Sequence, residues 1–165
     1  MTNSTSISRR AVVAAALGLG LAPAFAQGNK SAGSAGSIEV WKDPNCGCCN
    51  DWVRHLQNNG FAVKVNESGN TAARNRLGVD PKFGSCHTGL VSGYAIEGHV
   101  PAQDIKRLLK EKPTAIGLAV PGMPVGSPGM DGPAYDDRKD PFDVLLLTQD
   151  GGSKVFQRYP GNAKA

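Results

Sequence analysis

Four cysteines offer the most reactive side chains in this sequence of 165 residues. Cys46, Cys48 and Cys49 fall within one short segment, and Cys86 follows much later in the chain. Cys46 and Cys49 form a C-x-x-C pair at a predicted helix start, where free N–H groups and the helix dipole stabilise a thiolate. A thiolate serves disulfide exchange and metal binding equally well, so this pair alone leaves both interpretations open.

Cys48 separates the two interpretations. A disulfide exchanger gains nothing from a third sulfur in the same segment and risks forming the wrong disulfide, whereas a metal site gains a ligand. Two structural disulfides are the ordinary interpretation of four cysteines in an exported chain, but the crowding at 46–49 makes that pairing hard to satisfy. The spacing therefore favours a metal site, with disulfide exchange by Cys46 and Cys49 as the alternative.

The elements that would position these sulfurs follow the order β-α-β-α-β-β-α. At about 100° per residue, Cys49, Trp52 and Leu56 share one helix face, which directs Cys49 toward the core. The expected elements are a strand at 38–41, a helix at 48–59, a strand at 61–65, a helix at 71–77, strands at 86–91 and 94–97, and a helix at 101–111. Residues 119–130 are rich in Pro and Gly and predict irregular structure, and a C-terminal hairpin is predicted over 144–156.

This order predicts an α/β fold, a thioredoxin-like mixed sheet flanked by helices with a C-terminal β-hairpin extension. In thioredoxin-like proteins, the loop before the third strand meets the active-site turn. Pro81 lies too early to be the proline that usually occupies that loop, and Cys86 stands near the place instead. A fourth sulfur facing the other three would complete a metal pocket.

The identity of the metal follows from the softness and the geometry of its ligands. Thiolates select Cu(I), zinc or iron–sulfur clusters, and structural zinc sites usually take cysteine pairs spaced C-x₂₋₄-C. The side chains of Cys48 and Cys49 diverge by about 100° on a helix, so one tetrahedral ion is hard for both to reach. Sulfurs that bridge several Cu(I) ions relax that demand. Copper is therefore the expected ion and zinc the alternative.

Three further side chains are weaker candidates for the metal site. Met123 and Met130 both follow a Pro-Gly pair, and thioethers are soft ligands. They could equally cap the core beneath an irregular loop. His87 follows Cys86 directly and would point to the opposite face of a regular strand, so it reaches the site only if the strand begins irregularly. No Ser-His-Asp constellation or paired carboxylates indicate a hydrolase.

The N-terminal residues predict export and one folded domain. Arg9 and Arg10 precede the apolar run 11–21 and an A-x-A motif ending at Ala26, which is the pattern of a signal peptide at 1–26, cleaved near Ala26. The apolar run is shorter than the roughly 20 residues that span a bilayer, so a retained membrane anchor is the weaker interpretation. No long apolar stretch follows it, so we expect no membrane association after cleavage. Residues 27–37 form a flexible linker and 38–160 one metal-binding domain. No basic cluster alternates with aromatic residues, so no nucleic-acid partner is expected.

Several motifs, taken in order, resemble the CopG-type family of periplasmic copper-resistance proteins. They are Trp41–Cys49, Ser85–Thr88, Glu97–Pro101, Gly117–Pro124 and Gly126–Met130. The resemblance implies a thioredoxin-like fold and a multinuclear copper–thiolate site on Cys46, Cys48, Cys49 and Cys86. It also implies a periplasmic role in copper homeostasis, with copper ions and other periplasmic copper-handling proteins as partners. We expect a metal-binding protein, with a copper-dependent oxidoreductase as the alternative.

Overall fold

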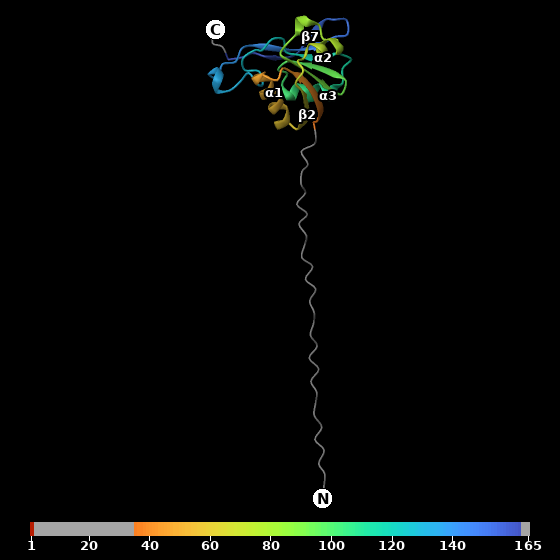
Figure 1. Ribbon diagram of the computed structural model, residues 1–165, viewed down its shortest axis with the longest axis vertical. Coiled ribbons are helices and arrows are strands. Elements are labelled where there is room, and N and C mark those ends of the chain that lie inside the picture. Colours follow the sequence, from red (N-terminus) through yellow and green to blue (C-terminus); the bar gives the residue numbers. More distant parts are fainter. Residues whose placement is uncertain (2–34, 163–165) are drawn as a thin grey trace. The chain divides into compact units, whose positions relative to one another are not determined.

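A seven-stranded sheet organises the chain in the computed structural model, which describes Met1 and residues 35–162 (Figure 1). The strands lie in the order β2-β1-β3-β4-β5-β6-β7. Their bounds are β1 Gly36–Lys42, β2 Phe61–Asn66, β3 His87–Val91, β4 Tyr94–Glu97, β5 Gly117–Ala119, β6 Phe142–Leu147 and β7 Ser153–Tyr159. Apart from Met1, the predicted signal peptide 1–26 and most of the predicted linker 27–37 lie outside the described residues.

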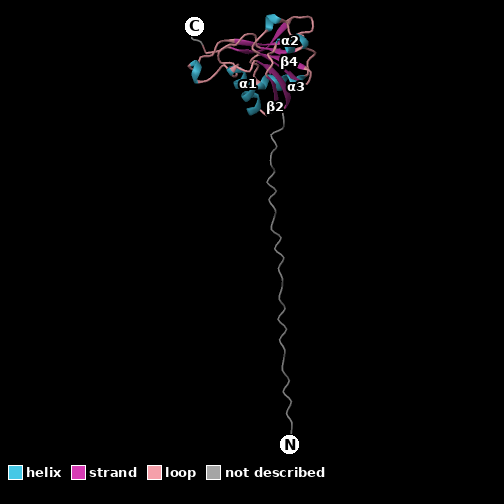
Figure 2. Cartoon of the chain, in the orientation of Figure 1, coloured by secondary structure: helices cyan, strands magenta, loops and turns pink. Residues whose placement is uncertain are grey.

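Three α-helices accompany the sheet in the described part of the chain (Figure 2). They are α1 Gly47–Asn58, α2 Thr71–Arg76 and α3 Ala102–Glu111, and two short 3₁₀ turns lie at Pro81–Phe83 and Pro133–Tyr135. Each helix lies within one residue of its predicted bounds at both ends. Gly60, with φ +87°, takes the left-handed conformation that follows the end of α1. Within residues 35–162, none of the helices is both long and apolar enough to cross a bilayer.

The strand pairing makes the sheet mixed. β1 pairs parallel with β2 and antiparallel with β3, and β3 pairs antiparallel with β4. β4 and β5 are parallel, while β5–β6 and β6–β7 are antiparallel. The predicted fold class, a mixed α/β sheet flanked by helices with a C-terminal β-hairpin, is confirmed. The thioredoxin-like label stays an interpretation from the order of the elements.

Strand β5 was not expected from the sequence, because the predicted irregular region was placed after the last helix without a strand. It spans only three residues, Gly117–Ala119, too few for a visible alternation. At Gly117 a Cβ atom would lie 1.8 Å from the carbonyl oxygen of Ala95, so only glycine allows this close strand pairing. β5 joins the hairpin of β6 and β7 to the rest of the sheet, so the hairpin is part of the main sheet.

Two apolar clusters show how the helices hold the sheet. In the larger cluster, Trp52 and Leu56 of α1 and Ile105 and Leu108 of α3 pack with strand residues such as Ile96. All of these side chains are fully buried, and each contributes about 1.5–3 kcal/mol of hydrophobic stabilisation. The smaller cluster gathers residues from strands β4, β5 and β6 with the segment after α2, namely Val79, Phe83, Ala95, Ala119 and Leu147. Helix α1, which contains Cys48 and Cys49 and follows Cys46 at its N-cap, is therefore anchored firmly.

Candidate metal centre

The sulfur atoms of the four cysteines converge at the N-terminus of α1. The Sγ atoms of Cys46, Cys48, Cys49 and Cys86 all lie within 4.8 Å of one another, close enough to hold a metal ion. Cys48 Sγ is 3.5 Å from Cys46 Sγ and 3.9 Å from Cys86 Sγ. Cys86 stands 37 residues beyond Cys49 in the chain, so the tertiary fold brings the fourth sulfur to the other three.

Cys46 and Cys49 are joined by a disulfide, and Cys48 and Cys86 are free thiols. Cys46 occupies the N-cap position of α1, and its side chain makes no capping hydrogen bond. Cys49 is fully buried, as its position on the apolar helix face predicts, and its Sγ lies 3.6 Å from the carbonyl oxygen of Cys86. In the disulfide form Cys49 has no hydrogen to donate to that carbonyl. Two of the four sulfurs therefore become thiolate ligands only after reduction.

His99 brings a nitrogen atom to the sulfur of Cys86. Its Nε2 lies 3.2 Å from Cys86 Sγ, and its Nδ1 lies 2.9 Å from the carbonyl oxygen of Pro128. Because a carbonyl only accepts hydrogen bonds, Nδ1 carries the proton and Nε2 presents its lone pair toward Cys86. The ring is fully buried, so this orientation is fixed. Cys86, His87 and His99 form a second group of potential ligands that shares Cys86 with the cysteine group.

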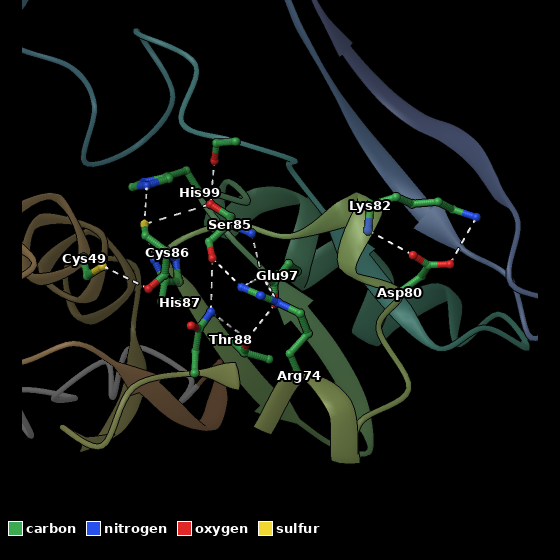
Figure 3. A network of polar contacts seen from close by, with 12 residues as sticks. Cys49, Arg74, Asp80, Lys82, Ser85, Cys86, His87, Thr88, Glu97 and His99 are labelled. Carbon is green, nitrogen blue, oxygen red and sulfur yellow. Dashed lines mark hydrogen bonds and ion pairs between the residues drawn. The ribbon is translucent and has the colours of Figure 1, made fainter. Parts of the chain in front are cut away.

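His87 lies on the other side of Cys86 (Figure 3). β3 begins at His87, so Cys86 stands just before the regular strand and the two side chains are not forced to opposite faces. The Nδ1 of His87 is 3.4 Å from Cys86 Sγ, and its ring lies 4.2 Å from the Trp52 ring. His87 is fully buried, and its Nε2 has no hydrogen-bond partner among the described residues. Its role as a ligand stays a prediction.

Burial controls the charge of these groups. Burial raises the pKa of the Cys86 thiol to about 12, and the nearby Cys48 thiol adds to the rise. Burial also lowers the pKa of His99, and it lowers that of His87 well below the usual value. Both rings are therefore neutral at pH 7, which is the form of imidazole that binds metals. Loss of the Cys86 proton needs a compensating positive charge nearby, such as a metal ion supplies.

Hydrogen bonds to β4 and to the segment after β5 hold the loop that carries Cys86 (Figure 3). The backbone N–H of Ser85 donates to Oε1 of Glu97 at 2.7 Å, and the Ser85 hydroxyl donates to the carbonyl oxygen of Gly122. A Cβ atom at Gly98, where φ is +70°, would lie 2.6 Å from the Ser85 side chain. The backbone before Cys86 is therefore packed tightly and fixed by hydrogen bonds.

The two Pro-Gly-Met motifs differ in their relation to the cysteines. A Cβ atom at Gly129 would lie 2.6 Å from the carbonyl oxygen of Cys48 and 2.8 Å from the backbone nitrogen of Trp52, so this loop rests on the first turn of α1. Met130 Sδ accepts a hydrogen bond from the Tyr135 hydroxyl at 3.5 Å. Met123 is 51% exposed. The roles of both methionines as ligands stay predictions.

The sequence indicated the cysteines as candidate ligands. For His99, which precedes Pro101, it favoured capping or loop hydrogen bonding over metal binding, and the bond to the Pro128 carbonyl is a loop hydrogen bond. The approach of its Nε2 to Cys86 depends on the pairing of β3 with β4, which places the two segments side by side. The Glu97-Gly98-His99 run directly after a predicted strand was the available signal.

Known proteins similar to this chain include two solved structures titled "Copper resistance protein copG", in Form 1 and Form 2. Each shares 49% sequence identity with the chain at a TM-score of 0.70, and each match covers 76% of this chain and 98% of the solved one. A family model described as a protein of unknown function, DUF411, matches residues 83–130. No curated protein matches the chain.

Proposed function

We propose that this chain, which belongs to the CopG family of copper resistance proteins, binds copper as Cu(I) through Cys46, Cys48, Cys49 and Cys86. The observation that carries the proposal is the convergence of four sulfurs from two separate segments within 4.8 Å. Sulfur is a soft donor, and a site made only of soft donors favours Cu(I) over hard cations. For zinc, the alternative, the order of affinities among divalent ions places Zn(II) below Cu(II).

The disulfide adds a step before copper can bind. Reduction of the Cys46–Cys49 bond takes two electrons and two protons from a dithiol reductant and gives two thiols. Copper ions then displace protons from the thiols, because the thiolate is the ligand. Alternation between the disulfide and dithiol forms would couple copper binding to the redox state of the compartment. The same coupling would serve a protein that changes the oxidation state of copper.

Several copper ions fit the donor arrangement better than one ion. Cys48 and Cys49 are adjacent, and their sulfurs approach Cys46 and Cys86 in different ways. Cys48 Sγ lies near the sulfurs of Cys46 and Cys86, whereas Cys49 Sγ is bonded to Cys46 Sγ and lies against the backbone of Cys86. Thiolates that bridge neighbouring ions use such divergent directions. His99 Nε2, directed at Cys86, is a further donor at the edge of this group.

Export completes the proposal. A signal peptide at 1–26 and a linker at 27–37 would deliver the domain 38–160 to the periplasm. There the domain would sequester Cu(I), relay it to other copper-handling proteins or change its oxidation state.

Copper retention in cysteine variants tests this function. The protein is reduced and loaded anaerobically, and copper is then removed by a competing Cu(I) chelator of known affinity. We expect Cys48→Ser and Cys86→Ser each to lose copper at lower chelator concentrations than the wild type does. Retention that is unchanged in both variants would remove copper binding at this site from consideration.

A thiol–disulfide oxidoreductase is the second candidate, and the disulfide at the start of α1 favours it. In that function Cys46 and Cys49 alone exchange with substrate disulfides. Insulin reduction would then survive Cys48→Ser and Cys86→Ser, which are the changes that copper binding does not tolerate. The same two variants therefore separate the candidates.

A further inference from the structure

A buried ion pair lies directly behind the segment that carries Cys86. Glu97 is fully buried, and its Oε1 accepts hydrogen bonds from Arg74, which is 15% exposed, at 2.8 Å. Its Oε2 accepts a hydrogen bond from the Thr88 hydroxyl at 2.6 Å, across the β3–β4 pair. A buried carboxylate persists only when its charge and its lone pairs are satisfied. Here Arg74 and the hydrogen bonds offset part of the cost of burial, which still raises the pKa of Glu97 above its ordinary value.

The Arg74–Glu97 ion pair forms hydrogen bonds with both polar groups of the Ser85 backbone, its N–H and its carbonyl oxygen (Figure 3). Glu97 Oε1 accepts the Ser85 N–H at 2.7 Å. Arg74 Nη2 donates to the Ser85 carbonyl oxygen, and Asn70 Nδ2 donates to the same oxygen at 3.1 Å. That carbonyl belongs to the peptide bond that leads into Cys86. We call Asn70, Arg74, Thr88 and Glu97 the Ser85 cradle.

The Ser85 cradle restrains backbone that is not held by the hydrogen bonds of a β-strand. β3 begins only at His87, so Ser85 and Cys86 stand outside the ladder of backbone hydrogen bonds between β1 and β3. Side chains from α2, β3 and β4 therefore fix this backbone. Charge-assisted hydrogen bonds of this kind are stronger and more directional than neutral ones.

We propose that Arg74 and Glu97 are positioning residues, which hold the Ser85–Cys86 peptide so that the Cys86 sulfur stays within ligand reach of Cys48. The inference rests on the proposed copper function for its purpose, but the positioning itself is a property of the fold. Residues that orient metal ligands in this way contribute to affinity without touching the ion. Cys86 is the ligand for which this matters, because the other three cysteines lie close together in the sequence at the N-terminus of α1.

Copper affinity in a double-mutant cycle tests the first consequence. By analogy with other residues that orient ligands, we expect Arg74→Ala and Glu97→Gln to weaken Cu(I) retention about 10- to 100-fold. In a Cys86→Ser background, Arg74→Ala should change retention by no more than about twofold, since its effect acts through that sulfur. An unchanged effect of Arg74→Ala in the Cys86→Ser protein would show that the cradle acts on overall stability and would overturn the proposal.

Matched controls come from the α3–β7 contact. Arg107 donates to the carbonyl oxygen of Phe156 at 2.6 Å, and the buried Asp104 accepts the Tyr159 hydroxyl at 2.6 Å. Arg107→Ala and Asp104→Asn thus remove the same chemistry at a distance from the cysteines. We expect wild-type copper retention in both. Equal losses in the control and the cradle variants would overturn the proposal.

A measurement without copper separates this inference from the proposed function. In the disulfide form the two free thiols are Cys48 and Cys86, with sulfurs 3.9 Å apart. Phenylarsine oxide bridges two thiols at that separation, and the rate of bridging reports their placement. We expect bridging about tenfold slower in Arg74→Ala and Glu97→Gln, because a small misplacement costs reactivity. Wild-type bridging rates in both variants would overturn the inference, whether or not the protein binds copper.

Folding of the variants is checked by circular dichroism. Should Arg74→Ala not fold, Asn70→Ala removes one donor from the Ser85 carbonyl and leaves the buried ion pair in place. It should slow bridging about two- to tenfold, the usual effect of one hydrogen bond. A bridging rate equal to that of the wild type would count against the cradle.

Discussion

The substitution Gly129→Ala tests whether the loop that contains Gly129 packs directly on the first turn of α1. Gly129 has φ +86°, and an alanine in the left-handed region costs roughly 1–2 kcal/mol. The new methyl group would also lie 2.6 Å from the carbonyl oxygen of Cys48, a contact with rigid helix backbone. Overpacking of this kind costs about 1–3 kcal/mol. We expect a total loss of about 2–5 kcal/mol in the free energy of unfolding.

The other Pro-Gly-Met motif supplies the control. Gly122 has φ +68°, and a Cβ atom there meets nothing within 4 Å. Gly122→Ala therefore carries only the backbone cost of about 1–2 kcal/mol. Urea unfolding measures both, and the extra loss at Gly129 should lower the midpoint by roughly a further 1 M at ordinary slopes. Equal midpoints for the two variants would refute the argument that this loop rests on α1.

Two further predictions concern proton and disulfide linkage. Burial lowers the pKa of the half-buried His55 below 6.5, and its Nε2 accepts the Ala102 N–H at the start of α3. The stability that His55 contributes is therefore complete above pH 6.5 and is lost as the pH falls through the pKa of His55 in the folded protein. His55→Gln should show a smaller decrease in the urea midpoint between pH 7.5 and 5 than the wild type does. An identical decrease in the two proteins would contradict this. The Cys46–Cys49 disulfide closes a short loop, with a sequence separation of 3. Its reduction should lower the free energy of unfolding by about 2 kcal/mol in the chain-entropy model, and no change in urea unfolding on reduction would argue against that estimate.

Local pattern was enough to predict most of the fold. Helical periodicity placed Cys49 and Trp52 on the buried face of α1, where both are fully buried. Gly60 ended that helix and Gly78 followed α2, each with positive φ. These features depend on neighbouring residues, which a sequence displays directly. β5 was missed because three residues beginning with Gly117 carry too short a pattern.

The parts of the site that escaped prediction depend on contacts between distant segments. His99 reaches Cys86 only because β3 and β4 pair in a particular register. Glu97 reads as an ordinary polar residue at the end of a short strand, yet it is buried and bound to Arg74 from α2. The hydrophobic periodicity of the sequence does not show which distant residues come into contact. The Cys46–Cys49 disulfide was weighed as an alternative, since spacing alone does not fix the redox state.

Copper content per chain, determined together with a free-thiol count, tests the central claim most directly. The protein is measured as isolated and again after anaerobic reduction and loading with Cu(I). We predict two free thiols and little copper in the disulfide form, and more than one tightly held copper ion per chain after reduction, with all four thiols then protected from alkylation. Less than one copper ion per chain after reduction, with four thiols open to alkylation, would contradict the account.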